Sequence, residues 1–90
     1  MAVTIHIPLI YRYLSNDVET LQVEGKTVGE CFHQLIKSFP QMRNAIFNEK
    51  GELQNLLEIF LNSKSAYPDE LAHPTKDGDE IYITTILSGG

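Results

Sequence analysis

Two segments in the first third of the chain alternate apolar and polar residues. Residues 2–7 carry β-branched residues at every second position, and residues 19–25 alternate Leu21 and Val23 with polar neighbours. A period of two places the apolar side chains on one face of a strand. We therefore expect two antiparallel strands that form a hairpin. The segment between them, residues 8–17, is ambiguous: its apolar run could extend a strand, but it ends in a turn signal.

The clearest helix signal follows, over residues 26–40. Thr27 and Glu30 have the T-x-x-E spacing of a capping box, in which each side chain serves an otherwise unpaired backbone amide. The apolar residues after the cap recur at intervals of three and four, which predicts one stripe along a helix: Val28, Cys31, Phe32, Leu35, Ile36 and Phe39. Pro40 is expected to end this helix.

The second half of the chain predicts shorter elements. We expect a helical turn over 41–47, a turn over 48–51 and a third strand over 56–62. A hairpin-like turn over 62–65, a possible minor strand near 66–72, an acidic turn over 77–80 and a final strand from Ile81 follow. One amphipathic helix on one face of a mixed sheet of four to five strands is an α+β roll. The first and last strands are the most apolar, so we expect them side by side at the centre. Residues 1–90 form one domain, since a chain of this length has room for a single core.

The charge balance excludes several classes of partner. The formal net charge is −5, without a cluster of Lys or Arg. Such a field repels nucleic acid and anionic membrane surfaces. No apolar run approaches the roughly 20 residues of a membrane span, and the N-terminus does not resemble a secretory signal. The expected location is the cytoplasm.

Few side chains suggest catalytic chemistry. Cys31 is interpreted as a small buried hydrophobic residue of the helix stripe, and a reactive thiol near the helix N-terminus is the alternative. His6, His33 and His73 come from a strand, a helix and a loop, so we expect solvated side chains and no metal site. Gly78 is expected to supply a positive φ in the acidic turn.

The chain ends in Ser88, Gly89 and Gly90. Glycine has no Cβ, so a flexible tail over residues 87–90 could lie in a narrow channel of a partner enzyme. Leu87 and Ser88 would set how far that tail reaches. A carboxylate is a poor electrophile, but transfer of AMP from ATP would turn the Gly90 carboxylate into a mixed anhydride that sulfur or an amine can attack. The tail would then be a reactant, not a catalyst.

The motifs follow one another in an order that resembles the ThiS/MoaD-type sulfur carriers. VTIHIP, VEGKTVGECFHQL, NEKGELQNLLEIFLN, KDGDEIYI and the terminal GG together span nearly the whole chain. The resemblance implies a β-grasp, ubiquitin-like fold. It is strongest to the branch with an inserted short helix and an N-E-x-G turn, which includes carriers paired with cysteine synthases and homologues of the molybdopterin-synthase small subunit. One departure is TTILSGG, since carriers of this group often have a proline before the glycines.

The resemblance implies a carrier protein rather than an enzyme. An E1-like enzyme would use ATP to adenylate the Gly90 carboxylate, and a sulfurtransferase or persulfide donor would convert it to a thiocarboxylate. The carrier would bind no cofactor and would deliver sulfur to a synthase that makes cysteine, molybdopterin or thiamin. Two alternatives stay open: a ubiquitin-like protein modifier that forms isopeptide bonds, and a non-covalent β-grasp interaction module.

Partner enzymes would have to dock on the sheet from which the tail emerges. Phe60 and Tyr82 lie on neighbouring strands if the resemblance holds, and they could form an apolar docking patch. The alternative is that both cover the core. Asp77, Asp79 and Glu80 are interpreted first as turn residues and second as an acidic docking surface. Three carboxylates in so short a turn lack the long ligand loop of a calcium site.

Overall fold

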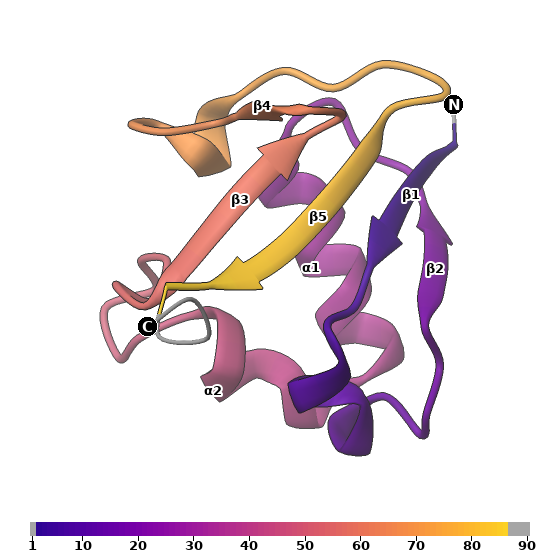
Figure 1. The fold of residues 1–90 in the computed structure, drawn as a ribbon, viewed down its shortest axis with the longest axis vertical. Coiled ribbons are helices and arrows are strands. Elements are labelled where there is room, and N and C mark those ends of the chain that lie inside the picture. The colour runs from indigo at the N-terminus through magenta and orange to yellow at the C-terminus, as the bar shows by residue number, and fades with distance from the viewer. Residues whose placement is uncertain (1, 87–90) are drawn as a thin grey trace.

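The structure, a computed structural model, describes residues 2–86. The elements in chain order are β1 (Val3–His6), the 3-10 helix η1 (Leu9–Leu14), β2 (Thr20–Val23), α1 (Val28–Ser38), the 3-10 helix η2 (Pro40–Met42), α2 (Arg43–Ile46), β3 (Leu57–Leu61), β4 (Lys64–Ser65), the 3-10 helix η3 (Glu70–Ala72) and β5 (Glu80–Thr85). The strands form one sheet in the order β2-β1-β5-β3-β4, and α1 lies behind it (Figure 1). This is the predicted α+β architecture.

The first and last strands lie side by side in the sheet, as the apolar pattern predicted. β1 and β5 run parallel, with Ile5 opposite Ile81. β2 pairs antiparallel with β1, and β3 pairs antiparallel with β5. The side chains of Ile5, Ile81 and Ile59 are fully buried. Because β1 and β5 are parallel, both strands end at the same edge of the sheet.

Helix α1 forms where the cap and the apolar stripe predicted it. Thr27 Oγ1 accepts a hydrogen bond from the N–H of Glu30 at 3.1 Å, and the Glu30 carboxylate accepts one from the N–H of Lys26 at 2.9 Å. The second bond lies one residue upstream of the amide that a capping box usually serves. The stripe buries Val28, Cys31, Phe32, Leu35 and Ile36. The helix ends before Pro40, which begins η2, and η2 with α2 accounts for the predicted helical turn.

The ambiguous segment after β1 is a 3-10 helix rather than more strand. Pro8 has no N–H to donate to the sheet, and its carbonyl accepts a hydrogen bond from the N–H of Tyr11 at 3.0 Å, which starts η1. No residue of η1 is fully buried. Leu9 and Tyr13 are 76% and 74% exposed. Leu9 and Tyr13 therefore lie on the surface, whereas Tyr11 and Leu14 of the same run pack against the core.

Two expectations between β3 and β5 need correction. The hairpin-like turn expected over 62–65 is confirmed in part: Asn62 at φ 58° reverses the chain directly after β3, and Lys64–Ser65 then pair with β3 as the edge strand β4. The minor strand expected near 66–72 does not form. Pro68 in that segment cannot donate to a ladder, and Glu70–Ala72 form η3 instead.

The core lies between α1 and the inner face of the sheet, and the outer face is mostly polar. The outer face presents Thr4, His6, Thr20, Gln22, Glu58, Phe60, Glu80, Tyr82 and Thr84, which alternate with buried residues along the strands. Phe60 and Tyr82 are the large ring side chains of this set that carry mainly apolar surface. No helix within residues 2–86 is long and apolar enough to cross a membrane.

Candidate functional site

Strand β5 leads towards the residues predicted to form the reactive tail. Those residues, 87–90, lie outside the part of the chain that the structure describes. The N–H of Ile86 donates to the carbonyl of Leu56 at 2.8 Å, and Leu57 lies opposite Thr85. These contacts with the start of β3 hold Ile86, the last described residue, at that end of the sheet, whereas the pairing of β5 with β1 stops at Tyr82.

Three ring side chains from three strands form a row across the outer face. Phe60 on β3 lies opposite Tyr82 on β5, and Tyr82 lies opposite His6 on β1. The rings of His6 and Tyr82 stack, with centroids 4.1 Å apart and planes 10° apart. The prediction that Phe60 and Tyr82 occupy neighbouring strands is confirmed. Tyr82 remains 37% exposed. We call these three residues the ring row.

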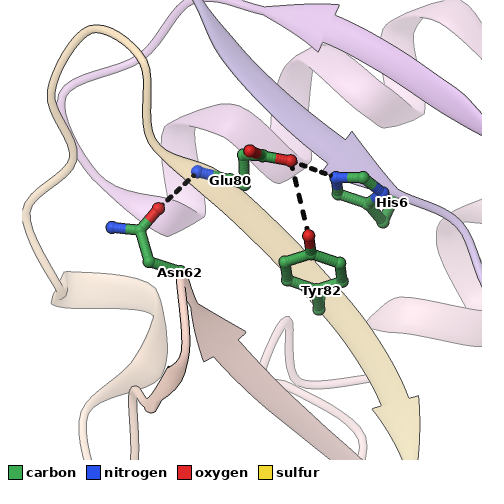
Figure 2. A network of polar contacts seen from close by, with 4 residues as sticks. All are labelled: His6, Asn62, Glu80 and Tyr82. Atoms are coloured by element: carbon green, nitrogen blue, oxygen red, sulfur yellow. Dashed lines mark hydrogen bonds and ion pairs between the residues drawn. The ribbon is translucent and has the colours of Figure 1, made fainter.

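Glu80 adds a carboxylate to the ring row. Its Oε1 atom lies 2.6 Å from His6 Nε2 and accepts a hydrogen bond from the Tyr82 hydroxyl at 3.4 Å (Figure 2). Its backbone N–H donates to Asn62 Oδ1 at 3.0 Å. The expectation of a solvated His6 is wrong, because its side chain is only 30% exposed and is both stacked and hydrogen-bonded.

The acidic turn does not present three equivalent carboxylates. Asp77 is exposed, and its Oδ1 accepts a hydrogen bond from the N–H of Ala2 at 2.7 Å. Asp79 is only 6% exposed, and it accepts hydrogen bonds from the N–H of Lys76 at 2.9 Å and from Asn62 Nδ2 at 3.2 Å. Asp79 therefore stabilises the turn, and the prediction that it belongs to an exposed docking surface is wrong.

The acidic turn and the last described residue, Ile86, lie at opposite ends of β5. Gly78 has φ of 89°, as predicted, and its N–H donates to the carbonyl of Ala2, which ties the turn to the start of β1. At about 3.4 Å per residue, a six-residue strand separates its two ends by roughly 20 Å. In Figure 1 the turn lies near the N-terminus, far from the end of β5. The ring row lies between them.

Cys31 has the environment of a core residue. Its side chain is fully buried beneath the sheet. Burial raises the pKa of the thiol above its ordinary value of 9.0; a hydrogen bond with Thr75 acts in the opposite direction, and the charges of Glu30 and Asp79 raise the pKa further. A protonated, inaccessible thiol is a poor nucleophile. The interpretation of Cys31 as a small hydrophobic residue is confirmed.

The other two histidines lie apart from the ring row. His33 is exposed on α1, with its ring tilted against Phe47 at 5.5 Å. His73 is half-buried, and its Nδ1 lies 3.2 Å from the carbonyl of Pro74. Within residues 2–86, no group of three or more His, Cys, Asp or Glu side chains is placed to hold a metal ion.

One feature near the end of β5 had no signal in the sequence. A groove of about 520 Å³ lies there, and its lining includes Leu53, Leu57, Glu58, Tyr67, Glu70 and Ile86. These residues come from the loop before β3, from β3 itself, from the segment after β4 and from the end of β5. A local sequence pattern could not reveal the groove, because only the first two of these four segments are adjacent in the sequence.

Comparisons with known proteins agree with the fold and the motifs. The model of the ThiS family matches residues 5–90. Small archaeal modifier protein 1 of Haloferax volcanii is 30% identical over 71 residues, which cover 78% of each chain. The sulfur carrier protein CysO of Mycobacterium tuberculosis is 25% identical over 93 aligned positions, which cover 100% of both chains.

A solved structure supports the same architecture. A chain in the crystal structure of the Amycolatopsis orientalis BexX/CysO complex superposes with a TM-score of 0.89, at 24% identity, over 99% of this chain and 100% of that chain. At that identity the likeness establishes the β-grasp fold alone. Because the family model covers nearly the whole sequence, this chain belongs to the ThiS family, a family of small β-grasp proteins that includes sulfur carriers and ubiquitin-like modifiers.

Proposed function

We propose that this protein is a sulfur carrier whose Gly90 carboxylate becomes a thiocarboxylate. The observation that carries the proposal is the family match that runs through residue 90, together with the Gly89-Gly90 pair at that point. The full-length alignment with a named sulfur carrier supports it. The protein acts as a co-substrate, and ATP is a substrate of the partner enzyme rather than a cofactor of this chain.

The proposed cycle has three steps. An E1-like enzyme joins the Gly90 carboxylate to the AMP of ATP and releases pyrophosphate. The outer sulfur of a persulfide, held by a sulfurtransferase or another persulfide donor, then attacks the acyl carbon and displaces AMP, which gives an acyl disulfide. A second thiol attacks the donor's sulfur, cleaves the S–S bond and forms a disulfide with the donor, which releases the thiocarboxylate. The carrier finally delivers this sulfur to a synthase in the formation of a small molecule such as cysteine, molybdopterin or thiamin.

Docking of these enzymes is proposed on the outer face of the sheet. The ring row supplies apolar area, and the exposed Asp77 and the half-buried Glu80 supply negative charge. Aromatic residues are enriched among the side chains that dominate protein interfaces. We expect Phe60→Ala and Tyr82→Ala each to weaken binding of a partner enzyme in a calorimetric titration. Asp77→Ala is expected to act chiefly on the association rate at low salt.

Intact-mass spectrometry tests the carrier function. The chain is incubated with the E1-like enzyme of the same organism, ATP, a persulfide donor and a thiol reductant. The expected product is heavier by the difference between one sulfur and one oxygen atom. A variant that lacks Gly90 is the control and should gain no mass. A carrier that stays unchanged with its own enzyme, or full sulfur delivery by the shortened variant, would refute the proposal.

A second function is supported by the relative from Haloferax volcanii, which is named a modifier protein. In that case a lysine amine of another protein attacks the Gly90 adenylate, an isopeptide bond forms and AMP leaves. Affinity purification of the tagged chain from native cells, followed by mass spectrometry of the conjugates, separates the two functions. A modifier yields lysines that carry the end of this chain as a branched remnant, which spans residues 77–90 after tryptic digestion because Lys76 is the last basic residue. This remnant is lost when Gly90 is deleted, and a dedicated sulfur carrier yields none.

A further inference from the structure

The groove at the end of β5 has features of a docking site that the ring row does not supply. It is lined in part by Leu53, Leu57, Tyr67 and Ile86. Tyr67 is 76% exposed and Ile86 is 56% exposed. Large apolar side chains that gather around a concave surface mark interaction sites more often than scattered ones do. Exposed large apolar side chains also gather on η1, at Leu9, Ile10 and Tyr13.

The position of the groove connects it with the proposed reaction. Ile86 both lines the groove and is the last described residue before the tail. Four further residues reach at most about 14 Å when fully extended. An enzyme that holds the Gly90 carboxylate in its active site must therefore lie against the end of β5. Tyr82, the member of the ring row nearest to Gly90 along the chain, is four residues further from Gly90 than Ile86 is.

The charge of the groove indicates what kind of surface it would bind. Glu58 and Glu70 belong to the lining, and no Lys or Arg does. A neighbouring groove on the same side of the molecule shares Glu70 and adds Glu52 and Asp69, also without a basic residue. Within residues 2–86 the carboxylates of Glu58 and Glu70 have no ion-pair partner. The lining also includes Gln54 and Asn55, so apolar and polar side chains line the groove in equal number. A groove of this kind, with two carboxylates that have no ion-pair partner within residues 2–86, is complementary to a segment that carries an apolar side chain beside an Arg or Lys.

We propose that this groove binds a segment of the activating E1-like enzyme in which an apolar side chain lies beside an Arg or Lys. The inference rests on the proposed sulfur-carrier function. Tyr67 and Ile86 would contact the apolar side chain, and Glu58 and Glu70 would pair with the cation. The groove thereby positions the carrier so that its tail enters the enzyme.

A kinetic comparison of two tyrosines tests the proposal. Tyr67 in the groove and Tyr13 on η1 have nearly equal exposure, 76% and 74%. Pyrophosphate release by the activating enzyme of the same organism is measured at increasing concentrations of wild-type carrier, Tyr67→Ala and Tyr13→Ala. We expect Tyr67→Ala to raise the KM for the carrier roughly tenfold with little change in kcat, as loss of an interface hot spot does. Tyr13→Ala is expected to keep the wild-type KM.

The charges are tested with the double variant Glu58→Gln and Glu70→Gln. Its KM should rise several-fold at low ionic strength and approach that of wild type at high ionic strength, because salt screens the lost attraction. Equal urea midpoints for all variants exclude unfolding as the cause. A wild-type KM for both Tyr67→Ala and the double variant would overturn the inference while leaving the carrier function intact. Normal activation of these variants combined with impaired sulfur delivery would also overturn the inference, because that result would assign the groove to the accepting synthase. No pyrophosphate release from wild-type carrier would refute the carrier function itself.

Discussion

Replacing Asp79 by alanine removes a buried carboxylate from the turn that precedes β5. The side chain is 6% exposed and accepts hydrogen bonds from the N–H of Lys76 and from Asn62 Nδ2. Without it, both donors lose their partner in the folded state. Asp77, two residues earlier, is the matched control, because it carries the same carboxylate in the same turn but lies exposed with one backbone partner.

The expected losses of unfolding free energy in Asp79→Ala and Asp77→Ala differ by several-fold. Each hydrogen bond to a charged acceptor contributes about 1.5–3 kcal/mol. Lys76 and Asn62 are themselves exposed, so water recovers part of that loss. We therefore expect Asp79→Ala to lower the free energy of unfolding by about 2–3 kcal/mol. For a domain of this size the shift in Tm is about 10–20 °C. Asp77→Ala should cost about 0.5 kcal/mol or less, as surface substitutions do.

Urea unfolding followed by far-UV circular dichroism measures both variants. With a slope of about 1 kcal/mol per molar urea, Asp79→Ala should unfold at roughly 2 M lower urea than wild type. Asp79→Asn keeps one acceptor oxygen, so its urea midpoint should fall between those of Asp79→Ala and wild type. Equal midpoints for Asp79→Ala and Asp77→Ala would show that the buried carboxylate does not stabilise the turn.

Three further predictions concern α1. Thr27→Ala removes the cap and should lower stability by about 1 kcal/mol, whereas Thr27→Ser should retain it; thermal melts compare the two. Phe32→Ala, at a fully buried position, should cost about 3–5 kcal/mol, and a urea midpoint close to that of wild type would contradict the assignment of Phe32 to the core. Burial raises the pKa of the Cys31 thiol above 9.0, so the protonated form is favoured in the folded state. The contribution of this thiol to the free energy of unfolding is complete below pH 9.0 and is lost as the pH rises towards the folded pKa. The difference in unfolding free energy between wild type and Cys31→Ala should therefore shrink above pH 9.0. A difference that stays constant with pH would refute this prediction.

Local patterns in the sequence determined most of the elements. The α1 cap and stripe, and the alternation in β1, β2, β3 and β5, involve residues no more than four positions apart, so the chain order specifies them directly. The positive φ of Gly78 follows from the turn in the same way. The family resemblance from the ordered motifs agrees with the family match over residues 5–90.

Only the tertiary structure decided which side chains are available for function. Asp77 and Asp79 look alike in the sequence, but Asn62, seventeen residues away, covers and bonds only Asp79. His6 looked solvated until the register of β1 and β5 brought it against Glu80 and Tyr82. The groove required four segments to meet. Burial and pairing depend on which distant segments the fold returns to a residue, whereas secondary structure depends chiefly on its neighbours in the chain.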